Sequence, residues 1–255
     1  LRNLTVSAEN KPAVISSGGI PGLIRLLLSP LPKVQMQAAL CLRNLSLHPA
    51  ADVEIVERGA LEPLISMLYA SDAKLQDAAV LVLRNLSVHP DNKPKILRQG
   101  GLPALISLLS SANASIQEQA VVLFRNLSLD PENEVRIVQE GGLPPLISLL
   151  RSPLENLQEH AAVTLRNLSL NDENEVRVVE EGVLPPIVQM LNSTSAVLQR
   201  QATGVLRNIS VNMENKLTIV QEGALPALIR LMASPDEDTV VQSCVVIRNL
   251  AVNAG

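Results

Sequence analysis

One tripeptide recurs along the chain at a fixed interval of 41 residues. The triplet is Arg-Asn-Leu in every copy except the sixth, which reads Arg-Asn-Ile. Its copies begin at Arg2, Arg43, Arg84, Arg125, Arg166, Arg207 and Arg248. A glycine keeps the same step at Gly18, Gly59, Gly100, Gly141, Gly182 and Gly223. A period of ~40–47 residues predicts a helical solenoid, in which each repeat packs only on its neighbours.

Residues 90–130 show how one repeat is built. A short first helix is expected to end at Gly100, because glycine accepts the left-handed backbone conformation at a helix C-terminus. Pro103 then opens the second helix, in the first turn where its missing N–H is not needed. After a turn, Ser115 is predicted to cap a third helix over residues 116–127, whose apolar residues recur at helical steps. Each repeat is therefore predicted to contain three helices.

The fixed step also predicts the domain organisation. The chain is expected to form a single domain over residues 1–255, because the core of a solenoid grows with the number of repeats. It begins, on this prediction, with a partial third helix at residues 1–8. The repeats follow at about residues 9–48, 49–89, 90–130, 131–171, 172–212 and 213–255.

Two segments carry a resemblance to a known family. Residues 141–146 read Gly-Gly-Leu-Pro-Pro-Leu, and residues 162–169 read Ala-Val-Thr-Leu-Arg-Asn-Leu-Ser. Both resemble the armadillo repeat family, and the likeness covers the whole chain. The form Leu-Arg-Asn-Leu-Ser is similar to that of plant U-box armadillo proteins, the vacuolar armadillo protein group and the catenins. The resemblance implies an all-α fold, a right-handed α-solenoid of about six three-helix repeats whose third helices line a concave groove.

The asparagine of the triplet is the first candidate binding residue. The resemblance implies that it points into the groove, where its amide bonds the main chain of an extended peptide. An amide carries both a donor and an acceptor, so a row of them holds a peptide backbone without reading its sequence. The matching positions are Asn44, Asn85, Asn126, Asn167, Asn208 and Asn249. In the alternative interpretation each asparagine ties its helix to the neighbouring repeat through a backbone carbonyl.

One helical turn earlier, the chain departs from importin-like armadillo proteins. Those proteins carry tryptophan at this position, and the stacked indoles grip lysine side chains of a nuclear localisation signal. The matching residues here are Leu40, Leu81, Val122, Val163, Gly204 and Val245. None of them forms a cation–π shelf. The sequence therefore argues against a nuclear-import receptor.

The arginine of the triplet is the second candidate. The predicted peptide-binding set includes Arg43, Arg84, Arg125, Arg166 and Arg207. Seven residues earlier on the same helix stand Met36, Asp77, Glu118, Glu159, Arg200 and Val241. One interpretation is that acids and arginines pair across adjacent helices for structural reasons. The other is a groove of mixed charge, which prefers a partner with acidic residues near Arg200 and Arg207.

Composition excludes several classes of function. The net charge of −4 argues against a general binder of nucleic acid or of a membrane surface. Apolar runs such as residues 23–28 are too short for direct insertion across a bilayer. The sequence has no Gly-rich phosphate loop, nucleophile elbow or paired-carboxylate motif. Its three histidines are too widely spaced to share a metal ion. We therefore predict that the chain is not an enzyme and has no cofactor.

The two cysteines inform on the compartment. Cys41 and Cys244 are 203 residues apart, which is about five repeats and too far for a disulfide on this fold. Both are predicted to be reduced, buried thiols of an intracellular protein, located in the cytoplasm or in the nucleus and not secreted.

The leading hypothesis is a protein–protein interaction scaffold that binds an extended peptide segment of a partner along the groove. A first alternative is the substrate-recognition part of a ubiquitin ligase whose U-box lies outside this sequence. A second is a designed or recently amplified array without an evolved partner. The sequence also predicts end-to-end self-association, because Leu4, Ile247 and Leu250 belong to core faces that no further repeat covers.

Overall fold

The structure, a computed structural model, describes residue 5 and residues 9–252. Within this part of the chain every element is an α-helix, and the 18 helices are numbered α2 to α19. They fall into two compact units, Leu1–Asn133 and Glu134–Gly255, and each is described by itself. The predicted partial third helix at residues 1–8 lies, except for Thr5, outside the described residues. The prediction of a single domain stays a prediction.

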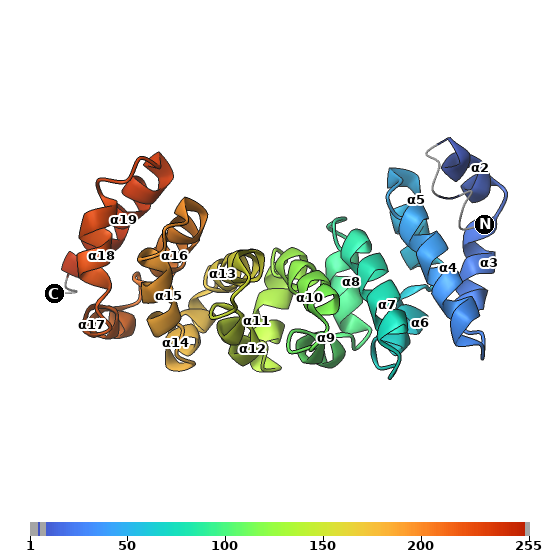
Figure 1. The fold of residues 1–255 in the computed structure, drawn as a ribbon, viewed down its shortest axis with the longest axis horizontal. Coiled ribbons are helices and arrows are strands. Elements are labelled where there is room, and N and C mark those ends of the chain that lie inside the picture. Colours follow the sequence, from blue (N-terminus) through green and yellow to red (C-terminus); the bar gives the residue numbers. More distant parts are fainter. Residues whose placement is uncertain (1–4, 6–8, 253–255) are drawn as a thin grey trace. The chain divides into compact units, whose positions relative to one another are not determined.

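Unit 1 contains three groups of three helices, coloured blue to green in Figure 1. Their bounds are α2 (Asn10–Ser16), α3 (Gly19–Leu27), α4 (Pro32–Leu45), α5 (Pro49–Glu57), α6 (Leu61–Leu68), α7 (Ala73–Leu86), α8 (Asn92–Arg98), α9 (Leu102–Leu108) and α10 (Ala114–Leu127). The third helices α4, α7 and α10 pack in succession, each against the next.

Unit 2 repeats this arrangement, coloured yellow-green to red in Figure 1. Its helices are α11 (Pro131–Gln139), which starts just before the boundary, α12 (Leu143–Leu149), α13 (Glu155–Leu168), α14 (Asp172–Glu180), α15 (Leu184–Leu191), α16 (Ala196–Ile209), α17 (Met213–Gln221), α18 (Ala224–Leu231) and α19 (Glu237–Ala251). Here α13 packs against α16, and α16 against α19. The predicted all-α fold with three helices in each repeat is confirmed.

The residues that start and stop these helices act largely as predicted. All six glycines of the 41-residue row have a positive φ, from 72° at Gly18 to 87° at Gly141, in the left-handed region that glycine enters without strain. Pro103 lies in the first turn of α9. The predicted cap Ser115 is wrong, because Asn113 caps α10 and its side chain accepts hydrogen bonds from the backbone N–H groups of Ser115 and Ile116. Asparagine and serine are equally good N-cap residues. Because α10 begins at Ala114, two residues earlier than predicted, the N-cap position falls on Asn113.

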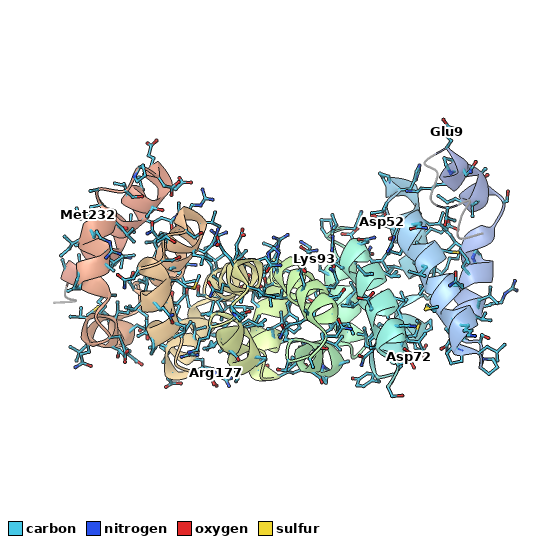
Figure 2. The ribbon with its side chains drawn as sticks, viewed as in Figure 1. Glu9, Asp52, Asp72, Lys93, Arg177 and Met232 are labelled. Atoms are coloured by element: carbon cyan, nitrogen blue, oxygen red, sulfur yellow. The ribbon has the colours of Figure 1, made fainter. Side chains whose placement is uncertain are left out.

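The core of each unit lies between the third helices and the shorter helices before them, where side chains fill the space (Figure 2). Two positions of the third helix supply much of it. The first position holds Leu42, Leu83, Phe124, Leu165 and Leu206, all with 0% exposure. The second holds Leu45, Leu86, Leu127, Leu168 and Ile209, again with 0% exposure. No described helix has the length and the apolar run that crossing a bilayer would require.

The two cysteines differ in burial, although neither forms a disulfide. Cys41 is 3% exposed, as predicted. The prediction that Cys244 is buried is wrong, because this residue is exposed on α19. The same position of earlier repeats holds Ala39, Val80, Val121, Ala162 and Thr203, each with 0% exposure. No helix that the structure describes follows α19, so this face, which is buried in the earlier repeats, is open at Cys244.

One glycine substitution tests the role of the left-handed residue. Gly182→Ala is expected to lower the free energy of unfolding by about 1–2 kcal/mol, because φ at Gly182 is 83° and alanine is strained there. No atom lies within 4 Å of the added Cβ, so a steric clash adds nothing. The control is Gly22→Ala inside α3, which also has open space and an ordinary helical backbone. It should raise stability by about 0.5–1 kcal/mol. Urea unfolding followed by circular dichroism measures both, and equal effects would contradict the assignment.

Candidate functional site

Within each unit, asparagines of the triplet connect a third helix to the third helix before it. Nδ2 of Asn208 donates to the backbone oxygen of Arg166 at 2.9 Å and to Oγ of Ser169 at 3.2 Å. The hydroxyl of Ser169 donates in turn to the same backbone oxygen of Arg166 at 2.9 Å. The same pair of amide bonds, with distances between 2.9 and 3.5 Å, is made by Asn85, Asn126 and Asn249.

This geometry uses the donor half of the amide. The two hydrogens on Nδ2 serve the carbonyl and the hydroxyl of the previous repeat, so the orientation of the amide is fixed. The link between neighbouring repeats, one of the two predicted roles, is therefore present. Within the described residues, no hydrogen bond to Oδ1 is made at Asn85, Asn126, Asn208 or Asn249. Asn44 differs, because its Oδ1 accepts from Nη2 of Arg43 at 3.3 Å and its Nδ2 donates to Oγ1 of Thr5 at 3.1 Å.

In unit 2 an open pocket of about 430 Å³ brings candidate residues of two third helices together. Arg207 and Asn208 come from α16, and Arg248 and Asn249 come from α19. The rest of the wall is formed by Ser169, Leu170, Asp172, Glu175, Val211 and Val245. The pocket therefore combines guanidinium groups, side-chain amides and two carboxyl groups in one place.

The carboxyl groups of this pocket differ in environment. Asp172 is exposed, whereas Glu175 is only 7% exposed. Burial raises the pKa of Glu175 above its ordinary value, a hydrogen bond with Asn212 offsets part of this rise, and the charge of Asp172 adds to it.

In unit 1 a second pocket, of about 410 Å³, lies among α4, α7 and the start of α10. Leu40, at the position that importin-like proteins fill with tryptophan, forms its wall together with Met36 and Ala78. Asp77 and Lys74 supply one charge of each sign. The structure thus places an apolar surface at Leu40, where the sequence excludes an aromatic one.

The arginines of the row have different partners along the chain. Arg43 donates to the amide of Asn44, and Nη1 of Arg84 contacts Oε1 of Gln119. The guanidinium groups of Arg166 and Arg207 form no ion pair with any residue that the structure describes. Burial lowers the pKa of Arg166 below its ordinary value, and the charges of Arg207 and Arg200 lower it further.

The predicted pairing between the acidic row and the arginine row is wrong. Asp77, Glu118 and Glu159 form no ion pair with another described residue. Asp77 instead accepts a hydrogen bond from the hydroxyl of Ser115 at 3.0 Å. The two rows lie seven residues apart on each helix, or about 10 Å along its axis, so helices that pack side by side do not bring them together. Arg200, which occupies the position of these acidic residues on α16, does form an ion pair, with Asp236 at 3.7 Å.

A second asparagine row escaped the sequence interpretation. It consists of Asn92, Asn133, Asn174 and Asn215, which are at most 2% exposed. Each Nδ2 donates at 2.9–3.0 Å to the backbone oxygen six residues earlier, at the end of the preceding third helix. The signal was present in the sequence, because these residues keep the same 41-residue step. Their burial and their bonds to the preceding third helix assign them to the folding of the repeat.

Comparisons with known proteins identify structures with a similar fold. A search of the curated proteins finds no match. Among solved structures, the crystal structure of an engineered protein matches with a TM-score of 0.93 and 29% identity, covering 99% of this chain. The chain spans 63% of the length of that protein. A designed armadillo repeat protein in complex with the peptide (KR)4 matches with a TM-score of 0.84 and 25% identity, covering 91% of this chain and 99% of the other.

A third structure, of computationally designed armadillo repeat proteins for modular peptide recognition, matches with a TM-score of 0.86 and 25% identity over 90% of this chain and 99% of the other. The family model of the Armadillo/beta-catenin-like repeat matches six times, at residues 7–47, 51–88, 89–129, 130–170, 171–211 and 212–252. These matches cover most of the sequence. The chain belongs to the armadillo/beta-catenin-like repeat family.

Proposed function

We propose that this chain is a scaffold, and not an enzyme, that binds an extended segment of a partner protein along its third helices. The observation that carries the proposal is the pocket of unit 2, where Arg207 and Asn208 of one third helix meet Arg248 and Asn249 of the next. Its open volume of about 430 Å³ accepts a short stretch of polypeptide. The proposed binding residues remain the asparagine row and the arginine row as the sequence predicted them.

The structure refines the chemistry of this proposal. Because Nδ2 of Asn208 already serves the preceding repeat, its amide offers a peptide an acceptor and no donor. An extended peptide presents backbone N–H groups, each of which needs an acceptor when it leaves water. The fixed carbonyl oxygens of Asn208 and Asn249 supply that acceptor with little loss of conformational entropy, since the inter-repeat bonds already hold the amides.

The similar structures support binding of this kind. One designed armadillo repeat protein forms a complex with the peptide (KR)4, and others are computationally designed for modular peptide recognition. We extend the mode of binding to this chain but not the peptide sequence, because the unit 2 pocket carries arginines of its own. An intracellular location, cytoplasmic or nuclear, and the absence of a nucleic-acid partner go with this proposal, in line with the net charge of −4.

Self-association through the ends of the solenoid also stays a prediction. Its support is the open face of α19, where Val241 is 55% exposed and Cys244 is exposed.

The proposal is tested by two substitutions that break the same inter-repeat bond. Asn208→Ala removes the amide that donates this bond. Ser169→Ala removes the hydroxyl that accepts it but keeps the amide, and Ser169 is only 1% exposed. Both are expected to lower thermal stability slightly. Only Asn208→Ala is expected to lower the affinity for a bound segment. The expected loss is about tenfold, which corresponds to one hydrogen bond to a buried partner. Segments are found by affinity capture, mapped on overlapping synthetic peptides and measured by isothermal titration calorimetry.

The triple substitution of Asn126, Asn167 and Asn208 by alanine extends the test to both units. It should abolish binding while the helical circular dichroism signal is kept. Equal loss of affinity in Asn208→Ala and Ser169→Ala would show that the amides act only through packing of the repeats. Unchanged affinity in the triple variant would place the bound segment elsewhere.

A further inference from the structure

Three residues of α16 share one face of the helix: Arg200, Gly204 and Arg207. Their steps of four and three residues place them one above another on an α-helix. Glycine inside a helix costs about 1 kcal/mol relative to alanine. At the same position the other repeats carry a larger apolar residue, in Leu40, Leu81, Val122, Val163 and Val245. The presence of glycine at this position of α16 therefore needs a local structural explanation.

That reason is the side chain of Arg166, which reaches over from α13. A Cβ atom on Gly204 would lie 2.7 Å from Cδ of Arg166 and 3.2 Å from Oε1 of Gln242. Both distances are shorter than ordinary contacts, and the first is a clash. The aliphatic part of Arg166 thus crosses α16 at the place where a valine side chain would stand. The glycine lets a third arginine approach the two that lie above and below it.

The resulting cluster has little charge compensation. The charges of Arg207 and Arg200 both act on Arg166 and lower its pKa, beyond the larger effect of burial. Asp236 lies 3.7 Å from Arg200, an ion pair without a hydrogen bond. Asp236 also accepts hydrogen bonds from the hydroxyl and the backbone N–H of Thr239, which hold its carboxylate at the start of α19. Among the described residues, this pair with Arg200 is the one ion pair that a member of the cluster forms.

The carboxyl groups of the adjoining pocket leave this excess in place. Asp172 and Glu175 line the pocket with Arg207, but neither forms an ion pair with a described residue. Glu175 is buried, at 7% exposure, and Asp172 is exposed. Three like charges held together cost free energy unless an anion joins them.

We infer that Arg166, Arg200 and Arg207, brought together at Gly204, bind an oxyanion on the partner's extended segment, either a side-chain carboxylate or a phosphate group. The inference rests on the proposed function, since the cluster borders the pocket of Asn208 and Asn249 through Arg207. The planar guanidinium group matches carboxylate and phosphate oxygens equally well, with two parallel N–H donors. The anion offsets part of the positive charge of the cluster and fixes the position of the segment along the third helices.

Unit 1 lacks the elements of such a site. Its third helices carry leucine or valine at the glycine position. Arg43 is engaged by its neighbouring amide, and Arg84 by Gln119. Among the described residues, the combination of three converging arginines and a helical glycine is therefore particular to unit 2, and it gives the partner a single preferred register.

The test is a titration of the 255-residue chain with three peptides of equal length, followed by NMR through the arginine Nε–Hε signals. All are built on one Ser/Gly sequence: the first is neutral, the second has two central glutamates, and the third has one central phosphoserine. We expect both acidic peptides to bind at least about tenfold more tightly than the neutral one, as charge-assisted hydrogen bonds require. Stronger binding of phosphoserine than of glutamate would identify phosphate as the preferred ligand, and similar affinities would identify carboxylate as sufficient.

Three variants locate the site. Arg166→Gln and Gly204→Val should each lower the affinity for the acidic peptides by at least about tenfold. Gly204→Val does so because valine displaces the side chain of Arg166 without removing a charge. Arg151→Gln, an exposed arginine outside the third helices, changes the net charge equally and should leave affinity within about twofold. Circular dichroism checks the fold of each variant. Equal affinity for all three peptides, or full affinity in both Arg166→Gln and Gly204→Val, would overturn the inference.

The same titration separates this inference from the proposed function. If Asn208→Ala weakens every peptide while the arginine variants change nothing, the segment binds along the third helices without an oxyanion site. If the arginine variants remove binding and Asn208→Ala leaves it unchanged, the anion site stands and the amide row is not the peptide contact.

Discussion

Replacing Phe124 by alanine is expected to lower the free energy of unfolding by about 3–5 kcal/mol, the cost of a large cavity in a packed core. Phe124 has 0% exposure and is the largest of the fully buried side chains. It lies on α10, which packs against α7 within unit 1. Because a solenoid repeat is supported only by its neighbours, the effect should concentrate in the repeats around residue 124. Urea denaturation followed by circular dichroism gives the loss, and hydrogen exchange gives its location.

The other repeats supply a matched control for this substitution. The positions equivalent to Phe124 hold leucine in Leu42, Leu83, Leu165 and Leu206, all with 0% exposure. Phe124→Leu keeps an apolar side chain of a size that the repeat accommodates elsewhere, so we expect a loss of only about 1 kcal/mol. If Phe124→Ala and Phe124→Leu cost the same, the packing described around α10 is incorrect.

Cys244 should react with a maleimide reagent at least about a hundredfold faster than Cys41, because a buried thiol reacts only when the structure opens locally. Cys244 is exposed on α19, whereas Cys41 is 3% exposed within α4. Mass spectrometry of samples quenched over time measures both rates in one protein. The position of Cys244 is fully buried in the earlier repeats, so its reactivity reports directly whether anything covers this face of α19.

Two single-cysteine variants complete this experiment. Cys244→Ser leaves Cys41 alone and should label slowly in buffer but rapidly in urea. Cys41→Ser leaves Cys244 alone and should label rapidly in both. Protection of Cys244 that grows with protein concentration would reveal the predicted end-to-end association, and slow labelling of Cys244 at every concentration would contradict its exposure.

The fold was predictable because its signals are local and repeated. The glycines of the 41-residue row mark the end of each first helix, and the structure gives all of them a positive φ. The cap of α10 was missed because Asn113 and Ser115 are both good capping residues, and only the direction of the chain before the helix decides between them.

The site was less predictable, because it depends on how neighbouring repeats pack. Sequence indicated two roles for Asn208, but only the packing of α13 on α16 shows that its Nδ2 reaches the backbone of Arg166. The same is true of Gly204: its departure from leucine and valine is visible in the sequence, whereas the approach of Arg166 is not. The acidic row failed as a partner for the arginines because the third helices pack side by side, which leaves the two rows about 10 Å apart along the helix axis.

The amide links between third helices also bear on how chains of this kind change length. At four junctions between consecutive third helices, two in each unit, the later repeat sends the same amide to the same acceptors of the earlier repeat, a backbone carbonyl and a serine hydroxyl. Duplication or loss of a whole 41-residue segment through recombination therefore leaves a matching donor and acceptor at the new junction. Repeats joined by these hydrogen bonds can therefore be added, lost or exchanged, by natural variation or by engineering. Other residues, such as Gly204 and Arg166, are free to differ between repeats.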